Sequence, residues 1–275
     1  MNNFIATGKS GTIGRHFGTR AGCIAIDLSQ EIWNEKNLNI SNGDIVIHCA
    51  AIVGTEAVLR NKKLACQVNV SATRKLAQAA RKKGASRFIY VSTAHVYANK
   101  ETLITELDPV APQNIYAEQK YEAETSVVEE LSESNTEFCI ARVFSVLDWD
   151  VKAFTLGGSI RKLLDSRSSE LLTNCDDIRD FLTPRTVADS LIAIAGKPGL
   201  IGVVNVCSGQ SVTVRTAAQI MFKKSGIELP LEKTVAGNSL NPILIGDNSK
   251  LKDKLPDLDL SWNPSFFDLN QQVIL

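Results

Sequence analysis

The sequence predicts an α/β fold, a doubly wound parallel sheet followed by a smaller C-terminal lobe. Three observations indicate this class. Short apolar runs alternate with longer segments of helical periodicity up to Phe144, a glycine-rich turn follows the first run, and the alternation loosens after Phe144. The length of 275 residues suits one large α/β unit with such a lobe.

The predicted strands are short and rich in Ile, Val and Phe, the composition of strands that are buried on both faces of a parallel sheet. In the first half they are Phe4–Thr7, Cys23–Ile26, Ile45–Cys49, Arg87–Ser92 and Phe138–Val143. Helices are predicted over Leu59–Lys83, which ends before Gly84, and over Tyr116–Leu131. Because strands and helices alternate, we expect parallel strands joined by right-handed crossovers.

Beyond Phe144 the predicted elements are less regular. A further strand is expected at Val203–Cys207, and helices are expected at Ser159–Leu164, Val187–Ile194, Val212–Lys224 and Asn248–Lys254. The sequence has no internal repeat and no long linker. The second lobe is therefore expected to be built from insertions at the edge of the sheet.

Composition argues against several classes of protein. Thirty basic and thirty acidic residues give a formal net charge of +0, whereas nucleic-acid-binding proteins carry a basic excess. The stretch Pro198–Val214 is interrupted by Gly, Asn and Gln, so we expect no membrane span. The first residues lack the pattern of a secretory signal, and six scattered cysteines form no C-x-x-C pair, so the cytoplasm is expected. Three histidines, none spaced as a ligand pair, predict no metal site.

A glycine-rich turn spans residues 7–14, directly after the first predicted strand. Glycine lets the backbone turn sharply and approach a pyrophosphate, which then lies at the N-terminus of the next helix. This placement indicates a dinucleotide site of the Rossmann type. The residues predicted to contact the dinucleotide here are Gly8, Gly11, Ile13 and Gly14.

Asp27 follows the second predicted strand. A carboxylate at this point accepts hydrogen bonds from the adenosine ribose 2′-OH and repels a 2′-phosphate, which favours NAD as the cofactor. The interval from Gly14 to Asp27 is short, so the first helix is expected to span only Arg15–Arg20. Lys9 and Arg15 place positive charge near the phosphates, which keeps NADP as an alternative.

A hydroxyl, a phenol and an ammonium group are expected at one end of the sheet. Thr93 follows the fourth predicted strand, and Tyr116 and Lys120 share a helix face because they are four residues apart. A positive charge at Lys120, together with an oxidised nicotinamide, lowers the pKa of a nearby phenol from about 10. Such a phenol can exchange a proton with a sugar hydroxyl while hydride moves to or from the cofactor. Thr93, Tyr116 and Lys120 are therefore candidate catalytic residues, and Lys120 is also expected to contact the cofactor.

The order of these features resembles the extended short-chain dehydrogenase/reductase family, in particular its NAD-dependent epimerase/dehydratase branch, which acts on nucleotide sugars. The resemblance covers nearly the whole chain. Further segments that match family motifs are His48-Cys49-Ala50-Ala51 (H-x-A-A), Val68–Thr73 (V-N-V-x-x-T), Ala141–Ser145 (L-R-x-x-N), Arg179-Asp180-Phe181 (R-D-F/Y), Asn205–Gly209 (N-V-x-S-G), Asp247–Leu251 and Trp262–Pro264.

The resemblance implies a division of the chain and a set of partners. Residues 1–145, with parts of 175–210, are expected to form the NAD(P)-binding domain, and residues 146–275 mainly a substrate-binding lobe. The implied substrate is a nucleoside-diphosphate sugar. A homodimer is expected, with the helices after Leu59 and Tyr116 as candidate interface elements. The implied site residues are Ala50, Ala51 and Asn69 for the cofactor, and Ser145 and Arg179 for the substrate.

Departures from the family's motifs reduce the number of reactions that are expected for this chain. In the family's 4,6-dehydratases an Asp and a Glu follow the catalytic hydroxyl residue, whereas this chain has Ala94 and His95, so a dehydratase is not expected. GDP-fucose synthases resemble this site and have a Cys at the position of His95 as an acid/base. His95 is therefore either a further catalytic residue, with an ordinary pKa near 6.5, or a polar residue that shapes the sugar pocket. Ser145 stands in place of the family's Asn, which leaves the sugar open.

The expected function is hydride and proton transfer at C4 of a nucleoside-diphosphate hexose, by an NAD(P)-dependent epimerase or 4-ketosugar reductase. The compact first half resembles reductases related to dTDP-4-dehydrorhamnose reductase, and the Arg179–Phe181 segment resembles 4-epimerases. A non-catalytic dinucleotide-binding regulator on the same fold is the alternative. The presence of both Tyr116 and Lys120 favours the enzyme.

Overall fold

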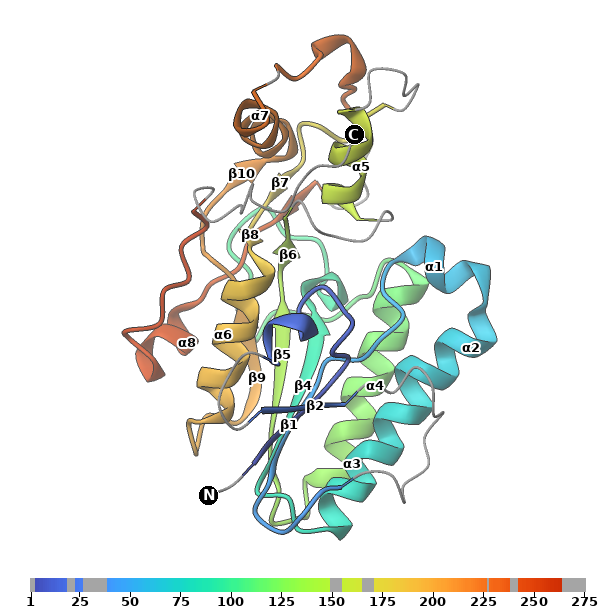
Figure 1. Cartoon of the computed structure of the whole chain (residues 1–275), viewed down its shortest axis with the longest axis vertical. Helices are drawn as coiled ribbons and strands as arrows, with labels where there is room; N and C mark the ends of the chain where they lie inside the picture. The colour runs from blue at the N-terminus through green and yellow to red at the C-terminus, as the bar shows by residue number, and fades with distance from the viewer. Residues whose placement is uncertain are drawn as a thin grey trace.

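The computed structural model describes residues 3–18, 23–26, 39–148, 155–164, 171–226, 228–237 and 242–263. In these ranges the main feature is a sheet of six parallel strands in the order β2-β1-β3-β4-β5-β9 (Figure 1). The strands are β1 (Phe4–Thr7), β2 (Cys23–Ile26), β3 (Ile45–His48), β4 (Arg87–Thr93), β5 (Glu137–Val143) and β9 (Gly202–Val206). The predicted parallel α/β sheet is confirmed, and each predicted strand lies within a residue of an observed one.

Helices cover both faces of this sheet because successive side chains of each strand point to opposite faces. Val46 of β3 packs with α3 (Ala72–Lys82) and α4 (Ile115–Leu131) on one face. Its neighbour Ile47 packs with α6 (Pro184–Ala195) on the other face. Figure 1 shows the three layers, with α6 on one side of the strands and α3 and α4 on the other. The doubly wound arrangement is therefore confirmed.

The carboxyl ends of β1 and β3 form the switch point of the sheet. β2 pairs with one edge of β1 and β3 pairs with the other, so the chain leaves β1 in one direction and returns past it in the other. In open α/β sheets, ligands bind in the crevice outside the strand ends at such a switch point. The glycine-rich turn after β1 lies at this point.

The predicted helix Leu59–Lys83 is divided into four pieces in the structure. They are α1 (Thr55–Arg60), α2 (Lys62–Cys66), the π-helical turn η3 (Gln67–Ser71) and α3. Asn61 has the extended backbone angles φ −151° and ψ 80°, and its side chain caps α2 by accepting a bond from the Leu64 amide. The predicted helix Arg15–Arg20 is a 3₁₀ turn, η1 (Gly14–His16), in its described part. Apolar periodicity therefore predicts the buried side chains of α3, such as Leu76, Ala79 and Ala80, whereas the predicted continuous helix is wrong.

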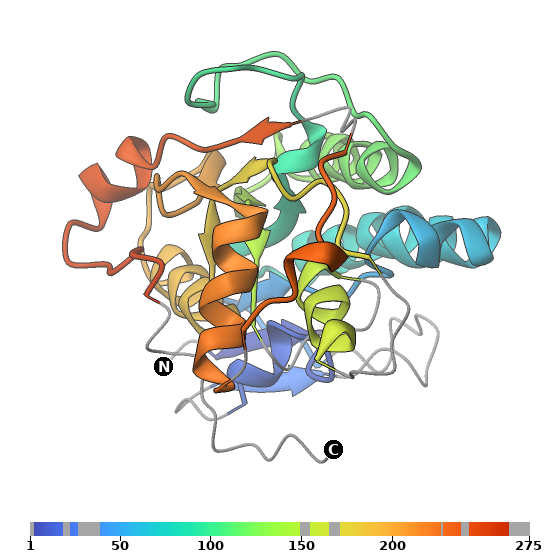
Figure 2. The same cartoon turned by 90° about the horizontal axis from the view of Figure 1, so that it is seen from above.

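The second lobe stands at one end of the sheet and has its own small sheets. β6 (Ser145–Val146) pairs with β8 (Phe181–Leu182), and β7 (Ile178–Arg179) pairs with β10 (Val212–Thr213) and β11 (Ile243–Leu244). In Figure 2, α5 (Leu156–Leu163, yellow-green) and α7 (Val214–Lys224, orange) lie side by side above the sheet. Apolar residues of both helices share one core with Phe181 and Trp262. The remaining short elements are η4 (Ala94–Val96), η5 (Leu231–Lys233) and α8 (Ser249–Lys254).

The helices predicted beyond Phe144 correspond to α5, α6, α7 and α8, and the predicted strand corresponds to β9. Because α6 and β9 belong to the layers of the main sheet, the chain returns to it after its first excursion into the lobe. The proposed boundaries at residues 145 and 146 stay a prediction.

Candidate active site

The glycine turn after β1 has no room for side chains at two positions. Gly8 has a φ of +80°, and a Cβ added there would lie 2.8 Å from the Ala50 amide nitrogen. A Cβ added at Gly14 would lie 1.8 Å from the Gly8 carbonyl oxygen, a distance that no carbon atom can adopt. The Gly11 amide donates to the same Gly8 carbonyl at 2.9 Å. Gly8, Gly11 and Gly14 therefore form one tight turn, and it contacts the loop that begins at Ala50.

A chain of buried hydrogen bonds holds this turn to the end of β3. The Thr7 hydroxyl oxygen accepts from the amides of Cys49 and Ala50, both at 3.2 Å. It lies 2.8 Å from His48 Nδ1, and His48 Nε2 lies 2.9 Å from the Thr73 hydroxyl, which donates to the Asn69 carbonyl. These partners are all satisfied when Thr7 donates to Nδ1 and a neutral imidazole donates from Nε2. Burial, followed by the charge of Lys120, lowers the pKa of His48 to about 3, so the imidazole is neutral.

Asn69 lies in the π-helical turn η3 and is buried, with 1% of its surface exposed. Its amide nitrogen donates to the Ile52 carbonyl at 3.0 Å and to Gln119 Oε1 at 2.9 Å, and its oxygen accepts from the Ile52 amide at 2.8 Å. Both amide hydrogens are thus used by protein atoms. The structure places Asn69 as a support that fixes the Ala50–Ile52 loop to α4.

Thr93 and Lys120 both lie near the carboxyl end of β4. Thr93 is the last residue of β4, is 7% exposed and accepts a hydrogen bond from the His95 amide. Lys120 of α4 donates from Nζ to the Val91 carbonyl at 2.6 Å and lies 4.2 Å from the centre of the Tyr90 ring. Tyr116 is one helical turn before Lys120 on the same face of α4, and Asn114 caps the helix just ahead of it.

The pKa values of the Tyr116–Lys120 pair are moved by burial. Burial lowers the pKa of Lys120 to about 8, although Cys49 and Glu124 oppose this shift. Burial, together with Cys49, raises the pKa of Tyr116 above its ordinary value. In the protein by itself the phenol is therefore a weaker acid than a free tyrosine, the opposite of the shift expected when a positive cofactor is near. The Lys120 ammonium is directed at Val91 and Tyr90, and this leaves desolvation as the main effect on the phenol.

The other residues predicted to contact the cofactor lie in three different places. Ile13 is half-buried at the start of η1 and packs against the core on the α6 side of the sheet. Ala50 and Ala51 lie in the loop after β3 that the glycine turn contacts. Asp27 lies outside the described residues, directly after β2. Its predicted role in choosing NAD stays a prediction.

The second lobe brings Arg179 to the same end of the sheet. The charge of Arg179, after burial, lowers the pKa of His95 to about 4, so the two side chains are within electrostatic reach of each other. Arg179 forms an ion pair with Asp177 at 2.6 Å and donates to the carbonyls of Ile178 and Pro242 at 2.9 and 3.0 Å. Ser145 begins β6 beside this segment, since its amide donates to the Asp180 carbonyl at 3.0 Å.

A pocket of about 240 Å³ opens beside Arg179. It combines an apolar wall from α5 and α7 with polar groups from the strand segment before β7. Asn174, in this segment, has the left-handed φ of 55°, which an asparagine tolerates better than most residues. The lining residues are Leu156, Ser159, Leu171, Leu172, Thr173, Asn174, Asp177, Arg179 and Val214.

Several polar residues of the site were missed by the sequence prediction. Asp180, fully buried between β7 and β8, accepts bonds from the Ser208 amide and hydroxyl, both at 2.7 Å, and from the Gly209 amide at 2.8 Å, so it ties the segment after β9 to the lobe. Asp177, the partner of Arg179, carried no recognisable signal. Glu124, a buried carboxylate on α4, had one signal, because it follows Lys120 by the same four-residue step that joins Tyr116 to Lys120.

A glycine turn at the switch point of a parallel sheet, with a Tyr–Lys helix packed against the next strands, defines a protein of the extended short-chain dehydrogenase/reductase class. The comparison with family models agrees. The model described as "NAD dependent epimerase/dehydratase family" matches residues 7–207. The chain belongs to this family.

Sequence relatives include nucleotide-sugar reductases. The chain is 30% identical over 137 residues to dTDP-4-dehydrorhamnose reductase of Mycobacterium tuberculosis, and this match spans 45% of each protein, less than half of the relative's length. It is 25% identical over 255 residues to GDP-6-deoxy-D-mannose reductase of Pseudomonas aeruginosa, covering 82% of this chain and 81% of that one.

Solved structures share the fold over almost the whole chain. RMD from Pseudomonas aeruginosa, complexed with NADPH, superimposes with a TM-score of 0.83 at 21% identity, covering 97% of this chain and 96% of that one. MoeE5, in complex with UDP-glucose and NAD, superimposes with a TM-score of 0.82 at 20% identity, covering 96% of this chain and 95% of that one. These similarities establish the Rossmann-type α/β fold.

None of the helices in the described ranges has the length and apolarity needed to cross a membrane. The same ranges contain no cluster of three or more His, Cys, Asp or Glu side chains able to hold a metal ion.

Proposed function

We propose that this protein is an NAD(P)-dependent nucleotide-sugar oxidoreductase that transfers hydride and a proton at C4 of a nucleoside-diphosphate hexose. The observation that carries the proposal is the placement of Thr93, Tyr116 and Lys120 at the carboxyl edge of the sheet, beside the glycine turn. The family to which the chain belongs is described as NAD-dependent. The reductases among its relatives support the same class of reaction.

The residues present fit a dinucleotide. Gly8 and Gly14 keep the crevice clear of side chains where a pyrophosphate approaches the backbone, since a Cβ at either position would collide with main-chain atoms. Ala50 lies directly against Gly8, and Ala50 and Ala51 are proposed to contact the dinucleotide there. When bound, the nicotinamide supplies hydride acceptor and donor chemistry. The protein's part is to hold the sugar's C4 near it and to move the proton.

Tyr116 is the proton carrier in this proposal. In the direction of reduction its phenol gives a proton to the C4 oxygen, and in the direction of oxidation it takes one from the C4 hydroxyl. Lys120 is buried but is still charged at pH 7, because its pKa is lowered only to about 8. Burial raises the pKa of Tyr116 in the protein by itself, so the phenol is protonated and is ready to give its proton in the direction of reduction. Thr93 donates a hydrogen bond to the same sugar oxygen.

Arg179 and the pocket beside it are proposed to bind the nucleoside diphosphate. A guanidinium is suited to phosphate oxygens, and the apolar wall formed by Leu156, Leu172 and Val214 suits the base and ribose. Asp177 already neutralises part of the charge of Arg179, so the protein offers a moderated positive site. His95, neutral above a pKa of about 4, is proposed to hydrogen-bond the sugar near Thr93.

A 4-ketosugar reductase is the first candidate reaction, since both relatives described above are named as reductases. A 4-epimerase is the second, because the family's description includes epimerases and Arg179-Asp180-Phe181 resembles theirs. A reductase consumes reduced cofactor, whereas an epimerase regenerates it in each turnover. Dehydration stays disfavoured, since Ala94 and His95 supply no carboxylate beside Thr93.

The test is a panel of UDP-, dTDP- and GDP-hexoses and their 4-keto derivatives, each offered with NAD(H) and NADP(H). Absorbance of the reduced nicotinamide and the stereochemistry at C4 identify the reaction and the cofactor. We expect Tyr116→Phe to lose at least about 100-fold in kcat, the usual contribution of an acid/base residue, and Tyr121→Phe on the exposed face of α4 to keep its activity. Binding of a dinucleotide without turnover of any sugar would support the regulator instead.

The proposal includes a homodimer that acts in the cytoplasm. The helices α1, α2 and α4 expose the apolar side chains of Leu59, Leu64, Tyr121 and Val128, which are 50%, 38%, 40% and 40% accessible. Such residues on adjoining helices suit contact with a second copy. Light scattering during gel filtration distinguishes a dimer from a monomer, and a monomer at micromolar concentration contradicts this part of the proposal.

A further inference from the structure

The face of α4 that carries Tyr116 and Lys120 continues one turn further to Glu124. The three residues are four positions apart in sequence, so they lie in one row along the helix. Lys120 and Glu124 are each 3% exposed. A lysine and a glutamate buried in one row require an explanation, because burying charge is unfavourable unless each group is paired.

Both carboxylate oxygens of Glu124 are occupied by hydrogen bonds from the sheet. Arg142 of β5 donates from Nε to Oε1 at 3.1 Å and from Nη2 to Oε2 at 2.7 Å. The Ser92 hydroxyl also donates to Oε1. Ser92 is the residue before Thr93 at the end of β4, so Glu124 ties α4 directly to the strand that carries the catalytic hydroxyl.

The network continues from Arg142 through Tyr97 to β9 of the main sheet. The Arg142 guanidinium lies 4.5 Å from the centre of the Tyr97 ring, and the Tyr97 hydroxyl donates to Asn205 Oδ1 at 2.7 Å. Asn205 in turn donates to the Ile104 carbonyl at 2.9 Å. Glu124 is thus anchored through a rigid buried array, which gives it a defined place relative to the sheet.

Lys120 is surrounded by groups from three elements. From α4 the carboxylate of Glu124 acts on it, and from the end of β3 His48 and Cys49 are within electrostatic reach. From β4 the Tyr90 ring centre lies 4.2 Å from its Nζ. His48 is neutral, since its pKa is about 3. Burial lowers the pKa of Lys120, and the two groups that oppose this shift are Cys49 and Glu124. Glu124 is the carboxylate of the pair.

We propose that Glu124 is a positioning residue of the active site, which holds α4 in register with the end of β4 and keeps the Lys120 ammonium charged at the pH where the enzyme works. The inference rests on the proposed function, because it assigns the charge of Lys120 a part in proton transfer by Tyr116. It concerns a residue that touches neither sugar nor cofactor and that acts through Lys120 and Ser92.

The test is the pH profile of kcat for Glu124→Gln, a change that removes the charge and keeps the shape. Loss of a neighbouring anion lowers a lysine pKa by about one unit or more. We expect the alkaline limb of the profile to move down by about one pH unit, so that activity at pH 8 falls about tenfold relative to its value at low pH. Glu124→Asp keeps the charge and should keep the position of the limb.

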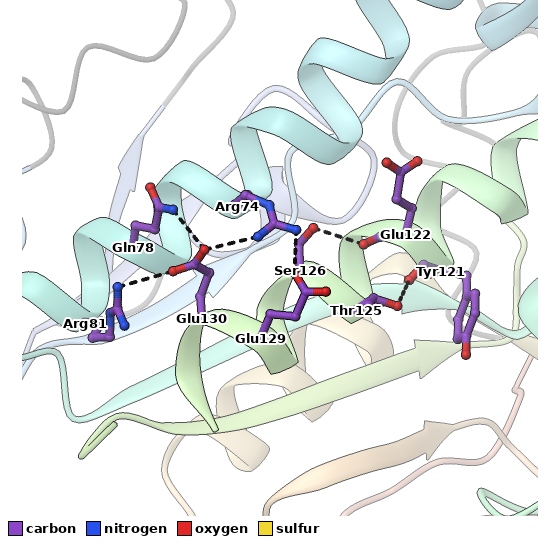
Figure 3. A network of polar contacts seen from close by, with 9 residues as sticks. All are labelled: Arg74, Gln78, Arg81, Tyr121, Glu122, Thr125, Ser126, Glu129 and Glu130. Atoms are coloured by element: carbon purple, nitrogen blue, oxygen red, sulfur yellow. Dashed lines mark hydrogen bonds and ion pairs between the residues drawn. The ribbon is translucent and has the colours of Figure 1, made fainter. Parts of the chain in front are cut away.

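Glu130→Gln is the matched control on the same helix. Glu130 lies on the side of α4 that packs against α3, where it accepts a hydrogen bond from Gln78 and forms ion pairs with Arg74 and Arg81 (Figure 3). It is also a paired glutamate of α4, and it is not among the groups that act on Lys120. Its loss should leave the alkaline limb in place. An equal shift in Glu130→Gln, or no shift in an active Glu124→Gln enzyme, overturns the inference.

A second variant protects the test against failure to fold. Glu124→Gln leaves Arg142 buried without its carboxylate, and the double variant Glu124→Gln/Arg142→Gln removes both charges. It should also shift the limb downward, by less than the single variant, because loss of the Arg142 cation partly offsets loss of the Glu124 anion. If the single variant does not fold, the double variant decides the matter, and an unshifted limb in it counts against the inference.

A readout without substrate separates this inference from the proposed function. The pKa of Lys120 is about 8 in the folded protein and 10.5 otherwise, so the unfolded chain binds more protons between these values and stability rises with pH across this window. In Glu124→Gln this rise in stability should begin at a lower pH than in the parent protein. If no sugar is turned over but the pH at which stability begins to rise is lower in the variant, the proposed function fails and the electrostatic role of Glu124 stands. If sugar is turned over but neither the onset of the rise in stability nor the alkaline limb of kcat moves, the proposed role of Glu124 is wrong and the proposed function still stands.

Discussion

Gly14 shows how strictly the backbone limits single residues in this site. Its missing Cβ would occupy the space of the Gly8 carbonyl oxygen, at 1.8 Å, and Gly8 itself needs a positive φ. Gly18, four residues later, has no heavy atom within 4 Å of an added Cβ and no positive φ. The spacing of the glycines predicted the tight turn, because only main-chain sterics are involved, and the contact of this turn with a dinucleotide stays a prediction.

Gly14→Ala should therefore distort the glycine turn, while Gly18→Ala should not. We expect the affinity for NAD(H) or NADP(H) to fall at least about tenfold in Gly14→Ala, the equivalent of about 1.4 kcal/mol. Gly18→Ala should bind as the parent protein does. Isothermal titration with each dinucleotide measures both. Equal affinities for the two variants would show that the turn does not approach the cofactor.

Side chains whose role depends on partners distant in sequence were harder to predict. The four-residue step between Tyr116 and Lys120 is a local property of a helix, and it was visible in the sequence. The pairing of Glu124 with Arg142, which are 18 positions apart, and of Arg179 with the Pro242 carbonyl depends on how strands and lobe segments are placed. The sign of the shift in the pKa of Tyr116 also depended on burial, which the sequence does not report.

At the scale of elements, Asn61 interrupts the predicted helix between α1 and α2, and the π-helical turn η3 widens it between α2 and α3. An extra residue in the turn re-aims side chains, and such bulges are frequent at functional sites. Here it carries Asn69, which bonds the Ile52 main chain and Gln119 of α4. The turn therefore links the loop after β3 with the helix of Tyr116 and Lys120.

Asn69→Ala should loosen this link between the loop and α4. Removing a buried partner leaves the Ile52 amide and Gln119 unsatisfied, which costs about 1–3 kcal/mol of unfolding free energy, and dinucleotide affinity should fall with it. Asn61→Ala is the control, since Asn61 is an exposed cap of α2 whose loss costs about 1 kcal/mol. Urea titration and dinucleotide binding measure the two effects. Unchanged binding in Asn69→Ala would confine Asn69 to a structural role.

At the scale of the whole molecule, the buried polar groups make stability depend on pH. His48 is fully buried between Thr7 and Thr73, and its pKa of about 3 lies far below the ordinary 6.5. Between these values the unfolded chain binds a proton that the folded protein does not. The stability contributed by neutral His48 is therefore complete above about pH 6.5 and is lost progressively as the pH falls towards 3.

The comparison of the parent protein with His48→Gln isolates this effect. One proton taken up on unfolding corresponds to a slope of about 1.4 kcal/mol per pH unit, so the parent should lose stability more steeply than the variant by about this amount between pH 6 and 4. Urea unfolding at several pH values measures both slopes. Parallel slopes would mean that His48 titrates normally in the folded protein.

By itself the sequence determined the class of the protein: the parallel sheet, the glycine turn, the row of Tyr116 and Lys120, and the family. These features follow from periodicity and from short-range spacing, which a chain expresses locally. Only the tertiary structure decided where the helix after β3 is interrupted, that Arg179 pairs with Asp177, and that Arg179 is within electrostatic reach of His95. Electrostatic pairing and burial depend on distances between segments far apart in the chain, and those distances exist only once the sheet and its lobe have come together.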